Sequence, residues 1–203
     1  MEIASTASSL FYLWRLEEEA PQLLALCREA GIPVEDLLAV PVKRQREKAA
    51  ERLLLCSAFG RPVSVGHTEQ GAPYVVDDEV NISITHTPRL VAVAIDEHRI
   101  IGIDAEQVDR QQVLRVRDKF LNAVEQRFIA PDDLAAHVIA WTAKEAIIKA
   151  ERNSALDWTH GITLEPFVSG DLPIAFTAAC GGNRYQLATR LVDGHYITLA
   201  ALA

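Results

Sequence analysis

Helical and strand patterns alternate twice along this sequence, and their order limits the folds open to the chain. Apolar periodicity predicts helices over residues 17–30 and 42–58, and short β-rich runs follow between residues 63 and 104. Helical pattern returns from about 111 to 150, and strands return from 161 to 202. Strands grouped in blocks favour antiparallel sheets in two α+β halves over a doubly wound parallel sheet.

Turn and cap residues place some of the boundaries. Gly60 and Pro62 end the second helix, and the pairs Gly181-Gly182 and Asp193-Gly194 are typical of hairpin turns. Asn122 and Glu125 have the spacing of a capping box. The sequence shows no internal repeat and no linker, so it predicts an N-terminal half over residues 1–100 that leads directly into a C-terminal half over residues 101–203.

Composition excludes several classes of protein. The 203 residues are 49% hydrophobic and 24% charged, which is typical of a globular protein with a sizeable core. With 20 basic and 28 acidic side chains the formal charge is −8, which disfavours nucleic acid as a partner. No apolar run approaches the roughly 20 residues needed to cross a membrane, and acidic residues follow the short run Leu10 to Trp14, so we expect a cytoplasmic protein without a secretory signal.

Two carboxylates lie two residues apart where the predicted strand 100–104 ends. In an extended chain Asp104 and Glu106 share a face, where like charges repel unless a positive group lies between them. Mg²⁺ suits such a pair, because it takes one or two carboxylates together with substrate phosphate oxygens. An isolated Asp-x-Glu is more often a pair of solvated side chains, so this pattern alone decides nothing.

A predicted apolar helix between His137 and Lys149 carries charged side chains along one stripe. Trp141, Glu145 and Lys149 follow a spacing of four residues, and Lys144 lies beside them. Glu145 could hold a metal while the two lysines hold a phosphate, a combination that suits phosphoryl transfer. The competing interpretation is an ordinary surface ion pair between Glu145 and Lys149, which stabilises a helix by only about 0.2–0.5 kcal/mol.

Two further features could bind phosphate. His86 follows the strand 81–85 and lies between two threonines, although a lone histidine is more often structural. A basic run occurs in the second predicted helix, where it is either a solvated face or a site for a phosphorylated ribose: Lys43, Arg44, Arg46, Lys48 and Arg52. The sequence has none of the patterns typical of dinucleotide oxidoreductases, P-loop NTPases, zinc peptidases or α/β-hydrolases.

Three short blocks occur in a fixed order along the chain: Ile82–Thr87 (ISITHT), Ile101–Glu106 (IGIDAE) and Trp141–Lys149 (WTAKEAIIK). This series resembles the 4'-phosphopantetheinyl transferase superfamily, specifically its longer single-chain branch that acts on many carrier proteins. That family carries a Ser-His-Ser block, a Gly-Ile-Asp-x-Glu block and a Trp-Ser-x-Lys-Glu-x-x-x-Lys block in the same order. The resemblance extends from about residue 42 to residue 168.

The resemblance implies a fold and an activity. The fold is α+β, with two similar α/β halves that contain small, mainly antiparallel sheets related by a pseudo-twofold axis. Coenzyme A lies in the cleft between them, with its adenosine side on the N-terminal half and the metal on the C-terminal half. The enzyme moves phosphopantetheine from coenzyme A to a serine of an apo acyl or peptidyl carrier protein and releases adenosine 3',5'-bisphosphate. We expect a monomer.

The same resemblance implies roles for individual residues. Mg²⁺ would be held by Asp104, Glu106 and Glu145. Coenzyme A would be bound by Arg44, Thr85, His86, Lys144 and Lys149. Phe120 and Glu125 resemble a further Phe-x-x-x-x-Glu block, and either Glu125 or Glu145 could take the serine proton while Lys149 stabilises charge on the diphosphate.

The chain departs from the family pattern at a few positions. Thr85 and Thr87 replace the serines around the histidine, and Ala105 replaces the usual isoleucine, changes that keep the chemistry. Ala72 stands where the family commonly has a lysine that lies near the coenzyme. Two other functions stay open: a degenerate relative that binds coenzyme A or a carrier without transfer, which Ala72 favours and the retained carboxylates disfavour, and a Mg²⁺-dependent hydrolase of nucleotide diphosphates.

Overall fold

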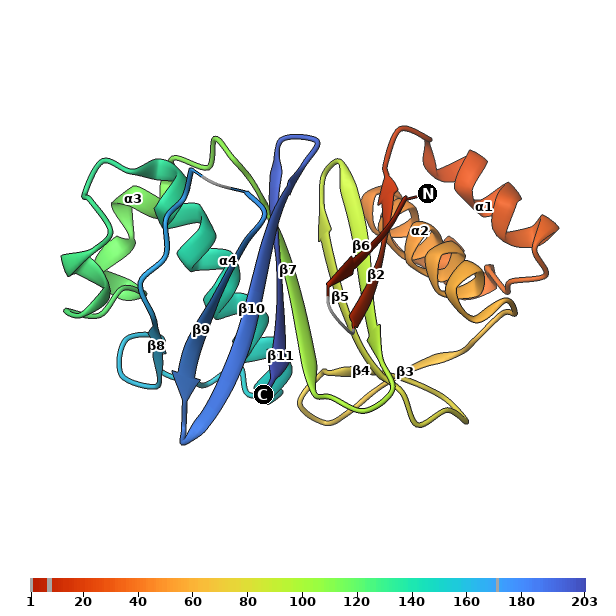
Figure 1. The fold of residues 1–203 in the computed structure, drawn as a ribbon. Coiled ribbons are helices and arrows are strands. Elements are labelled where there is room, and N and C mark those ends of the chain that lie inside the picture. The colour runs from red at the N-terminus through yellow and green to blue at the C-terminus, as the bar shows by residue number, and fades with distance from the viewer. Residues whose placement is uncertain (1, 7–8, 171) are drawn as a thin grey trace.

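The computed structural model describes residues 2–6, 9–170 and 172–203. Antiparallel sheets lie side by side in the middle of the molecule, and helices cover their outer sides (Figure 1). The mixed α+β class with small antiparallel sheets is confirmed. The predicted twofold similarity of the halves stays a prediction.

The first sheet has the order β1-β2-β6-β5, and all of its pairs are antiparallel. Its strands are β1 Glu2–Thr6, β2 Ser9–Arg15, β5 Asn81–Thr87 and β6 Leu90–Asp96. Its helices are α1 Ala20–Glu29, the 3₁₀ helix η1 Glu35–Ala39, and α2 Val42–Phe59. A separate ribbon pairs β3 Val65–His67 with β4 Pro73–Val75.

The second sheet has the order β7-β11-β10-β9-β8. Its strands are β7 Ile101–Gln107, β8 Ile162–Leu164, β9 Ile174–Cys180, β10 Asn183–Val192 and β11 His195–Leu202. Its helices are α3 Gln112–Arg115, the 3₁₀ helices η2 Arg117–Lys119 and η3 Glu125–Arg127, and α4 Leu134–Glu151. The hairpin turns predicted at residues 181–182 and 193–194 are confirmed.

Each of the two long helices has a cap at one of its ends. Gly60 ends α2 with a φ of 65°, a left-handed conformation that glycine adopts without steric cost. The buried face of α2 packs with α1 against the first sheet through Ala50, Leu53 and Leu54. At the start of α4, the Asp133 side chain accepts a hydrogen bond from the backbone N–H of Ala136 at 2.9 Å.

The two faces of β7 have different partners. Ile101, Ile103 and Ala105 belong to a buried cluster that joins β7 and β11 to β2 and β6 of the first sheet. The alternate residues of β7 point the other way, toward α4, because side chains alternate along a strand. This alternation positions Asp104 and Glu106 beside the helix that carries Glu145 and Lys149.

Gly102 lets α4 lie against β7 at that point. A Cβ atom there would meet the carbonyl oxygen of Ala146 and would lie 2.8 Å from the backbone nitrogen of Ala150. Backbone atoms cannot give way as a flexible side chain can, so this contact excludes any larger residue without a shift of the helix. The glycine of the Gly-Ile-Asp-x-Glu block therefore sets the distance between strand and helix.

The structure corrects three expectations about the elements. The strands β1 and β2 were not predicted, and they add a hairpin to the first sheet. The strand β7 continues to Gln107, so Asp104 and Glu106 lie within it and not beyond its end. Between residues 111 and 133 only short helices form, and α4 begins at Leu134.

Among the described residues, no helix has both the length and the apolar character needed to span a bilayer.

Candidate functional site

Asp104 is the central side chain of the site. It is 7% exposed, and its Oδ1 accepts hydrogen bonds from Thr85 Oγ1 at 3.0 Å and from Lys149 Nζ at 2.8 Å. These contacts bring together β5, β7 and α4, which come from distant parts of the chain. The structure therefore places three of the predicted residues in contact.

Lys149 fixes α4 against both sheets. Its ammonium group donates to the carbonyl oxygens of Ile103 at 2.9 Å and Ile84 at 3.4 Å, in addition to Asp104. The side chain keeps 30% of its surface exposed. The Lys149 side chain is thus only partly buried, so an anion could approach it.

Glu145 lies one helical turn before Lys149 on the same stripe. Burial raises the pKa of Glu145 above its ordinary value, and the negative charge of Asp104 raises it further, while Lys149 and Arg110 oppose the shift. A buried carboxylate whose ionised form is disfavoured by a neighbouring negative charge is a place where a cation would be stabilised.

Glu106 makes an ion pair with Arg110, four residues later in the chain. The guanidinium carbon of Arg110 also lies 5.3 Å from the centre of the Trp141 ring. Trp141 belongs to an aromatic group with Phe120 and Trp158, at ring distances of 5.3 and 4.8 Å. Glu106 is therefore connected through Arg110 to the start of the α4 stripe.

The donor set fits Mg²⁺, although the side chains do not form a closed cage. Within residues 2–6, 9–170 and 172–203, no three His, Cys, Asp or Glu side chains form a group that could hold a metal ion. Mg²⁺ rarely needs such a cage, because it takes one or two carboxylates and completes its shell with substrate phosphates and water. The positive groups of Lys149 and Arg110 already lie on Asp104 and Glu106, where a cation would be attracted.

A second polar group combines α2 with the end of β5. Arg44 Nη1 lies 3.0 Å from His86 Nε2, and Glu47 Oε2 lies 3.3 Å from both of these atoms. Burial lowers the pKa of His86; Arg44 lowers it further, whereas Glu47 raises it. These three residues line a cavity of about 430 Å³ together with Lys43 and Pro88.

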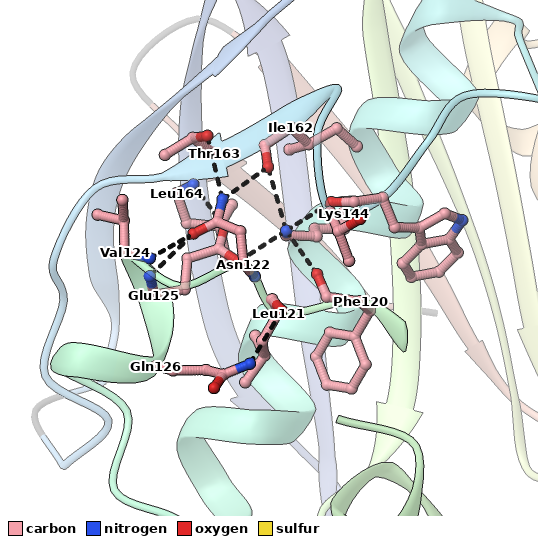
Figure 2. A network of polar contacts seen from close by, with 12 residues as sticks. Phe120, Leu121, Asn122, Val124, Glu125, Gln126, Lys144, Ile162, Thr163 and Leu164 are labelled. Atoms are coloured by element: carbon pink, nitrogen blue, oxygen red, sulfur yellow. Dashed lines mark hydrogen bonds and ion pairs between the residues drawn. The ribbon is translucent and has the colours of Figure 1, made fainter. Parts of the chain in front are cut away.

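Lys144 and Glu125 lie elsewhere and face each other in the core (Figure 2). Both side chains are 0% exposed, and Lys144 Nζ lies 2.7 Å from Glu125 Oε2. The ammonium group also donates to the carbonyl oxygens of Phe120, Trp158 and Ile162. Burial lowers the pKa of Lys144, while Glu125 opposes the shift.

Glu125 is equally enclosed. Its Oε1 accepts from the backbone N–H of Leu164 at 2.8 Å, and its Oε2 accepts from the N–H of Asn122 at 2.8 Å (Figure 2). Asn122 Oδ1 accepts from the N–H of Glu125 in return at 3.0 Å, so the predicted capping box is confirmed, on a 3₁₀ turn. With its polar atoms bound, this pair holds the 120–125 and 158–164 segments onto α4, a placement that argues against direct contact with coenzyme A.

Sequence reasoning missed some of the polar partners. Glu47 is a buried acid three residues after Arg44, a helical spacing that could have pointed to it. Ser83 Oγ accepts a hydrogen bond from the backbone N–H of Ile103 at 3.0 Å and links the edges of the two sheets. No sequence pattern pointed to Arg110, because its position depends on the turn after β7.

Ala72 lines a cavity of about 210 Å³ together with Lys149 and Arg152.

Residues 100–199 match the family model of the 4'-phosphopantetheinyl transferase superfamily. The chain contains a domain of this superfamily. The matched range includes the second and third sequence blocks, with Asp104, Glu106, Glu145 and Lys149. A comparison with curated proteins gives no match. The match over residues 100–199 supports a transferase, with phosphopantetheinyl transfer as the general function of the superfamily.

Proposed function

We propose that this protein transfers the 4'-phosphopantetheine group of coenzyme A to a serine of an apo acyl or peptidyl carrier protein. The observation that carries the proposal is the contact of Asp104 with Lys149, beside Glu145, on a strand and helix within the matched superfamily domain. This arrangement puts carboxylates and a partly exposed lysine side chain in one place, which a diphosphate with its cation requires.

Different residues would bind different parts of the coenzyme. Lys149, together with His86, would bind the diphosphate, and Arg44 would bind the phosphate on the adenosine ribose. The cluster of Arg44 and His86 supports this division, because it lies on α2 and β5, within residues 1–100. Mg²⁺, when bound by Asp104, Glu106 and Glu145, would neutralise negative charge on the diphosphate. Thr85 would keep Asp104 oriented through its hydrogen bond.

The chemical step needs a base for the serine hydroxyl. We assign this role to Glu145 and not to Glu125, because Glu125 is fully enclosed by Lys144 and backbone N–H groups. The serine oxygen bonds to the phosphorus next to pantetheine, and its proton passes to the Glu145 carboxylate. The bond from that phosphorus to the bridging oxygen breaks, and adenosine 3',5'-bisphosphate leaves.

The test is a reaction of this protein with coenzyme A, Mg²⁺ and an apo acyl carrier protein, in which the nucleotide product and the carrier mass are both followed. The proposal predicts equal amounts of adenosine 3',5'-bisphosphate and phosphopantetheinylated carrier, and neither product in EDTA. Release of nucleotide without a carrier would indicate a hydrolase instead. Coenzyme A binding without products, for several carriers, would indicate a degenerate relative.

A further inference from the structure

Arg110 contacts two different groups at the border of the carboxylate site. The chain leaves β7 at Gln107, and the backbone N–H of Arg110 donates to the Gln107 carbonyl oxygen at 3.2 Å, which turns the chain back toward α4. The guanidinium group then pairs with Glu106 and lies over the Trp141 ring. Its side chain is 33% exposed. Arg110 is thus positioned by the fold between β7 and α4.

The three carboxylates of the site are neutralised unequally. Asp104 pairs with Lys149 and Glu106 pairs with Arg110, whereas Glu145 makes no ion pair with any residue that the structure describes. The chain therefore supplies its own cations to two of the three groups. A divalent cation that used Glu106 would compete with Arg110 for this carboxylate.

We propose that Arg110 is an exchangeable partner of Glu106, which it neutralises until a divalent cation takes this carboxylate, and that Arg110 then binds a phosphate of coenzyme A beside Lys149. This inference rests on the proposed function. It assigns a substrate contact to Arg110, a residue that lies outside the three sequence blocks.

The chemistry of arginine suits both states. The Arg110 side chain is 33% exposed and that of Glu106 is 18% exposed. An ion pair that stays partly open to solvent contributes little, so its exchange for a stronger partner costs little. The guanidinium group stays charged and binds phosphate oxygens through two parallel N–H groups as readily as it binds a carboxylate. Contact with the Trp141 face keeps the released group at the site, because a cation over an indole ring is attracted to it.

The first test is Arg110→Gln, with Arg115→Gln as the matched control. Arg115 is exposed in α3, and it makes no ion pair with the described part of the chain. Mn²⁺ binding is followed by the EPR signal of the free ion, and coenzyme A binding by calorimetry, both without a carrier. In Arg110→Gln we expect Mn²⁺ to bind about two- to fivefold more tightly, because Glu106 no longer has an internal partner.

In the same variant we expect coenzyme A with Mg²⁺ to bind about tenfold or more weakly, because one charged hydrogen bond to phosphate is lost. If the role of Arg110 were only structural, its loss would weaken the binding of both Mn²⁺ and coenzyme A. Unchanged or weaker Mn²⁺ binding overturns the exchange, and unchanged coenzyme A binding overturns the phosphate contact. Arg115→Gln should match the wild type in both measurements.

A second variant tests the exchange without any metal. In Glu106→Gln, measured in EDTA, Arg110 is free to meet phosphate, so coenzyme A should bind more tightly than it binds to the wild type. Adding Arg110→Gln should remove this gain, and a gain that survives the double substitution overturns the inference. If the wild type transfers phosphopantetheine but these variants behave like it, only the role of Arg110 fails. If the wild type binds neither ligand, the proposed function itself fails.

Discussion

His86 makes the proposed phosphate site sensitive to pH. Burial lowers its pKa below the ordinary 6.5, so its ring is neutral in the free protein at pH 7. A bound phosphate favours the protonated ring, and coenzyme A binding should therefore take up a proton and become tighter as the pH falls from about 8 to about 6. In His86→Gln this gain in affinity should be smaller. The part that is lost is at most about tenfold per pH unit, because one proton is involved. Calorimetric affinities across this range provide the measurement.

Exposed His98, in the turn after β6, offers the control, and His98→Gln should keep the wild-type slope. An unchanged slope in His86→Gln would show that His86 does not contact the coenzyme.

The lowered pKa of His86 also makes the stability of the folded protein depend on pH. The unfolded chain binds a proton on His86 more readily than the folded chain does. The contribution of neutral His86 to folding is therefore complete above about pH 6.5 and is lost as the pH falls below that value.

Lys144 should prove to be a structural residue. Lys144→Met leaves the Glu125 carboxylate buried without its cation, which should lower the free energy of unfolding by about 3–5 kcal/mol. Lys144→Met combined with Glu125→Gln should lose less, because no charge stays uncompensated. Urea denaturation measures both variants. If the double variant folds but binds coenzyme A far more weakly than the wild type, Lys144 contacts the coenzyme after all.

The sequence predicted the relative positions of some site residues better than their surroundings. Helical spacing correctly put Glu145 and Lys149 on one stripe, since that follows from the helix itself. It could not show that Lys144, on the neighbouring face, is enclosed by carbonyl oxygens from the 120–125 and 158–164 segments. That environment depends on loops that are distant in sequence and have no regular period.

Among the elements, the contact between β7 and α4 determines the geometry of the site. Gly102→Ala would press a Cβ atom against the backbone of Ala146 and Ala150, so α4 should shift away from Asp104. We expect a loss of about 1–3 kcal/mol in the free energy of unfolding, and a loss of transfer that persists in the fully folded protein. Chemical denaturation and transfer assays at a temperature well below unfolding separate the two effects.

Gly170→Ala is the matched control, because a Cβ atom there would meet nothing within 4 Å. This variant should keep both the stability and the activity of the wild type. Wild-type activity in Gly102→Ala would show that the spacing between β7 and α4 does not matter for transfer.

The boundaries of the elements were predictable where local signals exist. Gly60 ends α2 and the glycine turns join β9, β10 and β11, because these conformations favour particular residues. The hairpin of β1 and β2 was missed, since β2 gains its place by pairing with β6, which lies about 80 residues further along the chain. The short helices between β7 and α4 were also missed, because their form depends on contacts with α4.

At the scale of the whole molecule, the site exists only where the two sheets meet. Thr85 of β5 binds Asp104 of β7, and Thr87 of β5 lies 3.1 Å from His195 of β11 through their side-chain polar atoms. Ser83 adds a third link across the same border. The block order of helices and strands predicted the class of the fold, but not this border, because it arises from contacts between residues far apart in sequence.

The central claim is that the site around Asp104 transfers phosphopantetheine to a carrier protein. The most direct measurement is the intact mass of an apo acyl carrier protein after incubation with coenzyme A, Mg²⁺ and either the wild type or Asp104→Ala. The account predicts a gain of one phosphopantetheine with the wild type. With a folded Asp104→Ala protein, the rate of this gain should be lower by at least about 100-fold. Equal rates for the two proteins would contradict it.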